Sequence, residues 1–224
     1  VKTPNIILLI NIIYIYIYKM FIPIGSSCHP AGNLDLLGLR KQSLPFDWLL
    51  VNQCNVFEYV NDLINNKFEN FTNNLIYNEN GKVISKNYKY AQFYHHDLIK
   101  NLAENGAKYN NGQIKRNDNG KNLIEVMNMR GQRFLNIISN KNNDVTFLCM
   151  VSHHLLVSES FYEDMKKFDT NENIKCNFKV FVYFNVVDND YKLVLPNKFS
   201  NLKHFIFDIY IKNESINKVF GDEK

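Results

Sequence analysis

The sequence predicts an α/β or α+β fold, with a mixed sheet and flanking helices in a single domain. Along most of the chain, apolar runs of strand length alternate with longer segments of helical periodicity. This alternation is typical of layered helices and strands. Hydrophobic residues make up 46% and aromatic residues 14% of the 224 residues, which is ample for one packed core.

The first half of the chain provides short strands, a helix and a hairpin. Residues 49–71 place apolar side chains on one helical face, and Asn55 is the candidate N-cap. Asn80-Gly81 is the two-residue turn that hairpins favour. The elements expected here are a strand at 21–24, a helical segment at 34–39, a helix at 49–71, a hairpin at 75–84 and a strand at 89–94.

The second half begins with a polar, Gly/Asn-rich loop at residues 100–120, which is long enough to flank a site. The elements expected after it are helices at 122–138 and 155–168 and strands at 144–151, 178–187, 191–195 and 202–210. We take residues 20–215 as the domain and 216–224 as a polar tail.

Residues 1–19 differ from the rest of the chain because residues 5–18 are apolar apart from Asn5 and Asn11. This run of about 14 residues is short for a membrane span, which needs roughly 20. We interpret residues 1–19 as an extension outside the domain, with Met20 as the natural start. The alternative is a membrane anchor formed by residues 5–18.

Composition excludes some partners and favours one compartment. A net charge of +4 without a dense Lys/Arg cluster argues against nucleic-acid binding. The four cysteines have no metal-ligand spacing and no C-x-x-C pairing, which suits a reducing compartment. Asparagine, at about one residue in six, is far above ordinary usage. Such a bias indicates AT-rich codons, as in large DNA viruses and some protists, so we expect a cytoplasmic location, or the host cytoplasm or virion for a viral chain.

Cys28 is the strongest candidate for chemistry. It follows the strand at 21–24 and the turn Gly25-Ser26-Ser27, and it precedes an apolar helical segment. A helix N-terminus carries partial positive charge and free N–H groups, which stabilise a thiolate. The N–H groups of Ser27 and Cys28 are candidate oxyanion donors. The alternative is an inert cysteine that only fills space.

Several blocks around Cys28 match a known pattern. They are Gly25-Ser26-Ser27-Cys28, Pro30-Ala31, Leu37-Gly38-Leu39-Arg40, Ser43 and Pro45-Phe46-Asp47-Trp48. Together with Tyr94–Asp97 and Met129–Phe134, these blocks resemble a family of papain-like cysteine peptidases, a domain otherwise of unknown function. The resemblance spans about residues 21–152. It implies a papain-like domain in which Cys28 is the nucleophile.

A cysteine nucleophile needs a base and a group that orients the base. Of the six histidines, His96 follows a strand and, with Asp97, matches the family pattern. His95 points to the opposite face of that strand, and we assign it to substrate binding. Asp97 and Asp47 are both candidates for the third catalytic group. Asp47 has an equally good alternative role as the cap of the following helix.

Further residues are candidates for binding or for a replacement base. Arg40 is expected to hold an anionic substrate group, as are Arg130 and Arg133, although such arginines more often pair with carboxylates. Trp48 is expected in the core or as a pocket wall. His153 and His154 also follow an apolar strand and are the next bases to consider. We expect no metal and no cofactor.

The function predicted from these residues is a cysteine hydrolase that acts on a peptide or another acyl substrate through Cys28 and His96. One alternative is an acyltransferase that uses the same residues with an acyl-CoA donor and a saccharide or similar acceptor. A capsule-polysaccharide acetyltransferase family with a papain-like fold has a similar Gly-x-Cys opening. The other alternative is an α/β interaction module without catalysis.

Overall fold

The computed structural model describes residues 20–47, 49–80, 82–93, 100–101, 108–109, 123–186 and 194–211. The expected extension at 1–19 and the tail at 216–224 lie outside these ranges. None of the helices within the described ranges has both the length and the apolar character needed to cross a bilayer.

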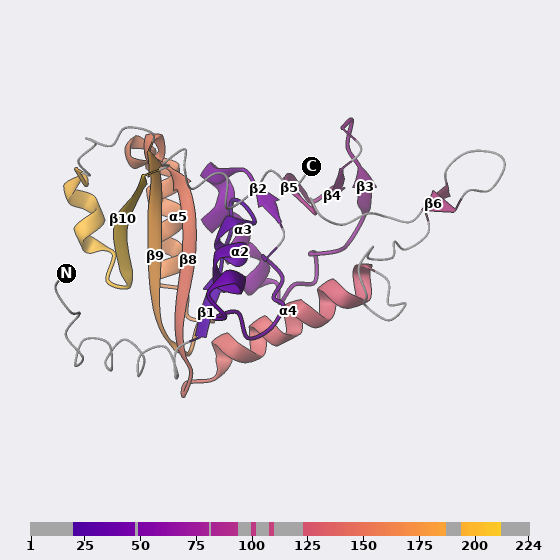
Figure 1. Cartoon of the computed structure of the whole chain (residues 1–224), viewed down its shortest axis with the longest axis horizontal. Helices are drawn as coiled ribbons and strands as arrows, with labels where there is room; N and C mark the ends of the chain where they lie inside the picture. Colours follow the sequence, from indigo (N-terminus) through magenta and orange to yellow (C-terminus); the bar gives the residue numbers. More distant parts are fainter. Residues whose placement is uncertain are drawn as a thin grey trace, which may run out of the picture.

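A four-stranded parallel sheet forms one side of the molecule (Figure 1). Its strands, in spatial order, are β1 (Met20–Pro23), β8 (Asp144–Ser152), β9 (Asn177–Val186) and β10 (Phe205–Ile211). Each neighbouring pair is parallel. The carboxyl ends of all four strands therefore meet at one edge of the sheet.

One face of this sheet is fully buried by helices. Alternate residues of β8, from Val145 to Val151, are at most 1% exposed on that face. The Phe147 ring lies 5.4 Å from that of Phe168 and 6.2 Å from that of Phe134. These contacts bring α5 (Glu159–Asp169) and α4 (Leu123–Ser139) onto the sheet. The core therefore lies between the sheet and these helices.

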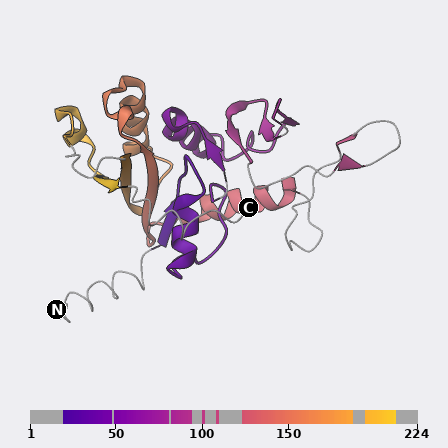
Figure 2. The same ribbon diagram turned by 45° about the horizontal axis from the view of Figure 1, so that its top comes forward.

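A four-stranded antiparallel sheet lies apart from the parallel one. Its spatial order is β2 (Leu50–Val51), β5 (Tyr88–Gln92), β4 (Val83–Ser85) and β3 (Leu75–Tyr77). Figures 1 and 2 show α3 (Val56–Asn65) between the two sheets, while α2 (His29–Leu36) packs against β1 and β8. The expected α/β class is confirmed, with parallel and antiparallel strands in separate sheets and four α-helices in the described ranges.

The expected helix at 49–71 is wrong at both ends. Residues 50–51 form β2, and a 3₁₀ turn (η1, Gln53–Asn55) precedes α3. Asn55 occupies the N-cap of α3 without a side-chain capping bond, whereas Asn52 caps η1 by accepting from the N–H of Cys54. After α3 the chain takes left-handed φ values at Lys67 and Phe68, 53° and 64°. This turn puts Phe68 into an aromatic cluster beside Phe134 instead of continuing the helix.

The helix expected at 155–168 is two separate elements. A 3₁₀ segment (η2, His153–Val157) continues from β8, and α5 begins only at Glu159. The break follows from Ser158, whose side chain accepts a hydrogen bond from the N–H of Phe161 and so caps a new helix.

Two other expectations differ from the structure. Within the expected loop at 100–120, the described residues pair as β6 (Lys100–Asn101) and β7 (Lys108–Tyr109). The described part of the strand expected at 191–195 is Val194-Leu195, which has no regular structure. A 3₁₀ turn (η3, Asn197–Asn201) follows it, so β10 begins at Phe205 and not at residue 202.

Candidate functional site

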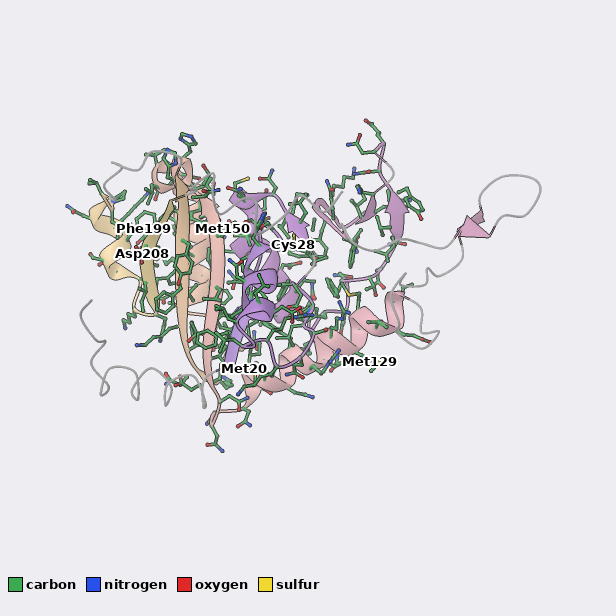
Figure 3. All side chains as sticks on the ribbon, viewed as in Figure 1. Met20, Cys28, Met129, Met150, Phe199 and Asp208 are labelled. Atoms are coloured by element: carbon green, nitrogen blue, oxygen red, sulfur yellow. The ribbon has the colours of Figure 1, made fainter. Side chains whose placement is uncertain are left out.

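Cys28 lies at the strand-to-helix junction that the sequence predicts. β1 ends at Pro23, and the N–H of Ile24 still donates to the carbonyl of Leu148 on β8 at 2.9 Å. The chain then turns, and α2 begins directly after Cys28, which is its N-cap. The thiol is half-buried and free of any disulfide. Figure 3 shows Cys28 and Met150 on these neighbouring elements.

The turn before Cys28 is built on the neighbouring strand. The hydroxyl of Ser26, which is 3% exposed, donates to the carbonyl of Met150 on β8. A Cβ at Gly25 would lie 2.6 Å from the backbone oxygen of Ser27, closer than real Cβ contacts allow. The turn therefore requires glycine at position 25 because of close approach, and the serine hydroxyl fixes it to the sheet.

The start of α2 presents backbone donors without partners. The first bond of the helix runs from the N–H of Gly32 to the carbonyl of Cys28, at 3.0 Å. Among the described residues, the N–H groups of Ser27, Cys28 and His29 donate no hydrogen bond. Pro30 has no N–H to offer. Such groups at a helix start attract negative charge, so the arrangement suits a thiolate or an oxyanion.

Asp47 is a fully buried carboxylate tied to Arg40. Its Oδ2 accepts from Arg40 Nε at 3.0 Å and from the N–H of Leu44 at 2.9 Å, while its Oδ1 has no hydrogen-bond partner. Burial raises the pKa of this carboxyl above its ordinary value, although the Leu44 amide and the charges of Arg40 and Arg130 oppose the rise.

These contacts bear on two predicted roles. Asp47 bonds back to Arg40 and Leu44 and not to the N–H groups of η1 or α3, whose N-caps are Asn52 and Asn55. Arg40 also contacts Asp35 at 3.2 Å and Ser43 at 2.9 Å. Its binding of a substrate anion stays a prediction, as does a catalytic role for Asp47.

Two histidines follow β8 at the carboxyl edge of the sheet. His153 is half-buried, and its Nδ1 lies 3.3 Å from the carbonyl of Asn185 at the end of β9. The exposed His154 stacks nearby, with ring centroids 4.0 Å apart. The N–H of Ser152 donates to Oε1 of Gln53 at 2.6 Å, which joins this edge to η1. Because β1 and β8 are parallel neighbours, these histidines share the edge towards which the Cys28 turn leads.

The other three cysteines have different surroundings. Cys149 is fully buried in β8, and burial raises its pKa far above the ordinary value. Burial also raises the pKa of Cys176 to about 11. Cys54 is half-buried on η1, with its sulfur 3.1 Å from Oδ1 of both Asn52 and Asn55. These oxygens are acceptors, whereas a thiolate needs donors. Cys28 therefore has the most favourable surroundings for a nucleophile.

The remaining predicted site residues can be placed only in part. Trp48, His95, His96 and Asp97 lie outside the described residues. His29 is exposed, with Nδ1 3.2 Å from the Ser27 hydroxyl. Within the described ranges, no group of three or more His, Cys, Asp or Glu side chains could hold a metal ion.

Sequence reasoning missed three residues that build this edge. Ser26 and Gln53 join the turn after β1 and η1 to β8, and Asn185 joins β9 to His153 of η2. Their partners are 32 to 124 positions away in the sequence, so no local pattern marks them. The only signal available was the position of Ser26 in the small-residue turn before the cysteine.

Residues 19–183, about three quarters of the chain, match a family described as "Putative papain-like cysteine peptidase". An uncharacterized protein of Acanthamoeba polyphaga mimivirus is 44% identical over 52 residues, which are 23% of this chain and 22% of that relative. The chain thus matches less than a quarter of that relative's length. No solved structure matches the chain.

Proposed function

The chain belongs to the family described as "Putative papain-like cysteine peptidase", and on that premise we propose that it is a cysteine-dependent hydrolase of peptide or other acyl substrates. The observation that carries the proposal is Cys28 at the N-cap of α2, half-buried, beside N–H groups that donate to no described residue. A nucleophile and an oxyanion site then come from the same turn, as acyl transfer requires.

The chemistry follows from this turn. The Cys28 thiolate attacks the substrate carbonyl carbon, and the carbonyl oxygen becomes an anion held by the N–H groups at Ser27 and Cys28. The leaving group departs with a proton from a histidine, which leaves an acyl thioester on the sulfur. Water, deprotonated by the same histidine, then attacks the thioester and releases the acid and the free thiol.

Two histidines are candidates for the base. His96 is the residue that the family resemblance indicates. His153 is favoured by its place at the carboxyl edge, where the Asn185 carbonyl lies 3.3 Å from its Nδ1 and can orient the ring. Oδ1 of Asn185 is buried and has no hydrogen-bond partner. The order Cys28, His153, Asn185 also matches the order of cysteine, histidine and asparagine in papain-type enzymes.

Activity measurements on single variants test the proposal and separate the two bases. Hydrolysis of a fluorogenic peptide or ester library by the purified chain is expected to disappear in Cys28→Ala and to persist in Cys54→Ala. Loss of a general base lowers the rate by about 100-fold or more. That loss is expected in His96→Ala or in His153→Ala. His95→Ala and His154→Ala are the control variants at the neighbouring histidines and are expected to keep their activity.

The outcomes are distinct. Equal activity in Cys28→Ala and the unmodified protein overturns the proposal. Loss of activity in Cys28→Ala with full activity in both base variants overturns the histidine assignments alone. Acyl transfer to an added alcohol or amine in preference to water identifies a transferase, because the acyl-enzyme step is common to both reactions.

A further inference from the structure

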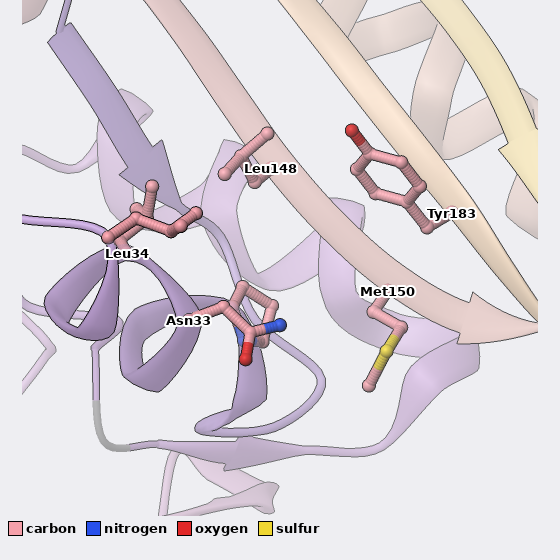
Figure 4. A pocket seen from close by; sticks show the side chains of 7 residues that line it. Asn33, Leu34, Leu148, Met150 and Tyr183 are labelled. Atoms are coloured by element: carbon pink, nitrogen blue, oxygen red, sulfur yellow. The ribbon is translucent and has the colours of Figure 1, made fainter. Parts of the chain in front are cut away.

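A pocket of about 210 Å³ opens between α2 and the parallel sheet (Figure 4). Its apolar walls are Pro30 and Leu34 from α2, the C-cap residue Leu37, and Leu148 and Met150 from β8. The α2 residues recur at helical spacing, so they share the face of α2 that is turned to the sheet. The pocket is therefore a built feature of the helix-to-sheet packing and not a gap at a chain end.

The pocket and the Cys28 turn share their walls. Pro30 is the second residue of α2, two positions after Cys28. Met150 lines the pocket, and its backbone carbonyl accepts the hydrogen bond from Ser26 in the turn. The pocket thus begins in the first turn of α2, the helix whose N-cap is Cys28.

The size and lining of the pocket define the group that fits. Among the described residues, Asn33 and Tyr183 are the polar side chains on its wall, and none of the described lining residues is charged. A cavity of about 150 Å³ with apolar walls is large enough for benzene. A pocket of about 210 Å³ therefore suits an uncharged apolar group of about six to eight heavy atoms.

We propose that this pocket binds the apolar acyl portion of the substrate whose carbonyl Cys28 attacks. The inference rests on the proposed function, since it takes Cys28 as the nucleophile. It names the substrate class as acyl groups that carry an aromatic or branched aliphatic chain, in contrast to charged or strongly polar ones. For a peptide, that chain is the side chain on the carbonyl side of the cleaved bond.

Thiol alkylation tests the pocket without relying on turnover. The unmodified full chain is treated with iodoacetamide or with its N-phenyl analogue, and mass spectrometry gives the rate at each cysteine. For each cysteine, the phenyl preference is the rate with N-phenyl iodoacetamide divided by the rate with iodoacetamide. We expect this preference to be about tenfold higher at Cys28 than at Cys54, since burying about half of a phenyl ring provides that gain. Cys54 is the internal reference because it is also half-buried but lies on η1, which contributes none of the described lining residues, whereas Cys28 caps the helix that lines the pocket.

Two adjacent leucines provide a matched pair of variants. Leu36 and Leu37 are 66% and 68% exposed, but only Leu37 lines the pocket. Leu37→Asp is expected to lower the phenyl preference of Cys28 to within about twofold of that of Cys54, because a charge at the mouth repels an apolar ring. Leu36→Asp is expected to leave the preference unchanged. Asn33→Phe fills the pocket from α2 and is expected to act like Leu37→Asp.

The results separate the pocket from the nucleophile. If Cys28 reacts with iodoacetamide but shows the same phenyl preference as Cys54, the pocket assignment is wrong and the proposed function stands. If Leu36→Asp and Leu37→Asp lower the preference equally, the effect is general to α2 and the pocket assignment is also wrong. If Cys28 does not react with iodoacetamide in the folded protein, the proposed function itself fails.

Discussion

Arg40 holds two carboxylates that differ greatly in exposure, and its removal gives a sharp test of this charged cluster. The side chain of Asp47 is 0% exposed and that of Asp35 is 58% exposed, while Arg40 itself is 13% exposed. Removing one partner of a buried ion pair costs about 3–5 kcal/mol, because the other charge stays buried and unpaired. Arg40→Ala leaves Asp47 with the Leu44 amide and an Oδ1 that already lacks a partner. We therefore expect its free energy of unfolding to fall by about 3 kcal/mol at pH 7.5.

The pH dependence of this loss has a definite sign. The pKa of Asp47 is raised in the folded protein, chiefly by burial. Its contribution to stability is therefore full below the ordinary value of 3.8 and is lost as the pH rises through the folded-state pKa. Arg40 opposes the rise, so Arg40→Ala raises the pKa of Asp47 further. Asp47 then takes up a proton more readily in the variant, and the difference in stability between the variant and the unmodified protein should shrink as the pH falls.

Urea denaturation at pH 7.5 and at pH 5 measures both effects, with far-UV circular dichroism as the probe. Asp35→Asn is the matched control, because it removes the exposed partner of the same guanidinium and is expected to cost less than about 1 kcal/mol. If Arg40→Ala lowers the free energy of unfolding by less than about 1 kcal/mol at pH 7.5, the buried Arg40–Asp47 pair does not stabilise the fold as argued. A loss that is equal at the two pH values would show that the proton uptake of Asp47 is misassigned.

Three further substitutions or reagents test the packing around the site. Gly25→Ala is expected to destabilise the protein by about 2 kcal/mol or more in the same urea assay, because the new methyl meets backbone and no rotamer relieves the contact; unchanged stability would contradict the tight turn. Gly131→Ala places a methyl 2.9 Å from the ring of Phe68, so a net loss of about 1 kcal/mol is expected in spite of better helix propensity, and a gain would show that the ring can move. In the folded protein at pH 7.5, iodoacetamide should leave Cys149 and Cys176 unmodified: the rise of the Cys176 pKa from 9.0 to about 11 lowers its thiolate population about 100-fold. Modification of either thiol before unfolding would contradict their burial.

Local sequence patterns predict the elements that depend on local contacts. The helix expected at 122–138 is α4 (Leu123–Ser139), and the strand expected at 144–151 is β8 (Asp144–Ser152). Both carry a long, clear periodicity of apolar residues, which fixes their type and nearly fixes their ends. The hairpin of β3 and β4 is also predicted, but Tyr77 pairs with Val83, so residues 78–82 connect the strands and the expected two-residue Asn-Gly turn is wrong.

Tertiary contacts decide the elements that the sequence misplaces. The periodicity of residues 49–71 continues to Phe68, but α3 ends at Asn65 because Phe68 turns into the aromatic cluster through a left-handed backbone. Gly131 on α4 makes room for that ring, 63 positions later in the chain. A pattern of apolar residues shows that Phe68 is buried, but it does not show which element buries it.

The candidate site likewise has a part that local sequence predicts and a part that tertiary contacts determine. The strand, small-residue turn, cysteine and helix are consecutive in sequence, so the position of Cys28 could be predicted. The contacts that fix this position could not, because they come from β8: Leu148 accepts from Ile24, and Met150 accepts from Ser26, 124 positions away. Leu148 and Met150 also line the pocket beside α2. β8 therefore holds the turn that carries the nucleophile and also forms one wall of the pocket. A shift in the β1–β8 register would move the sulfur and that wall relative to each other. The substrate preference and the reactivity of Cys28 are thus expected to depend on the same two residues of β8, neither of which belongs to any motif in the sequence.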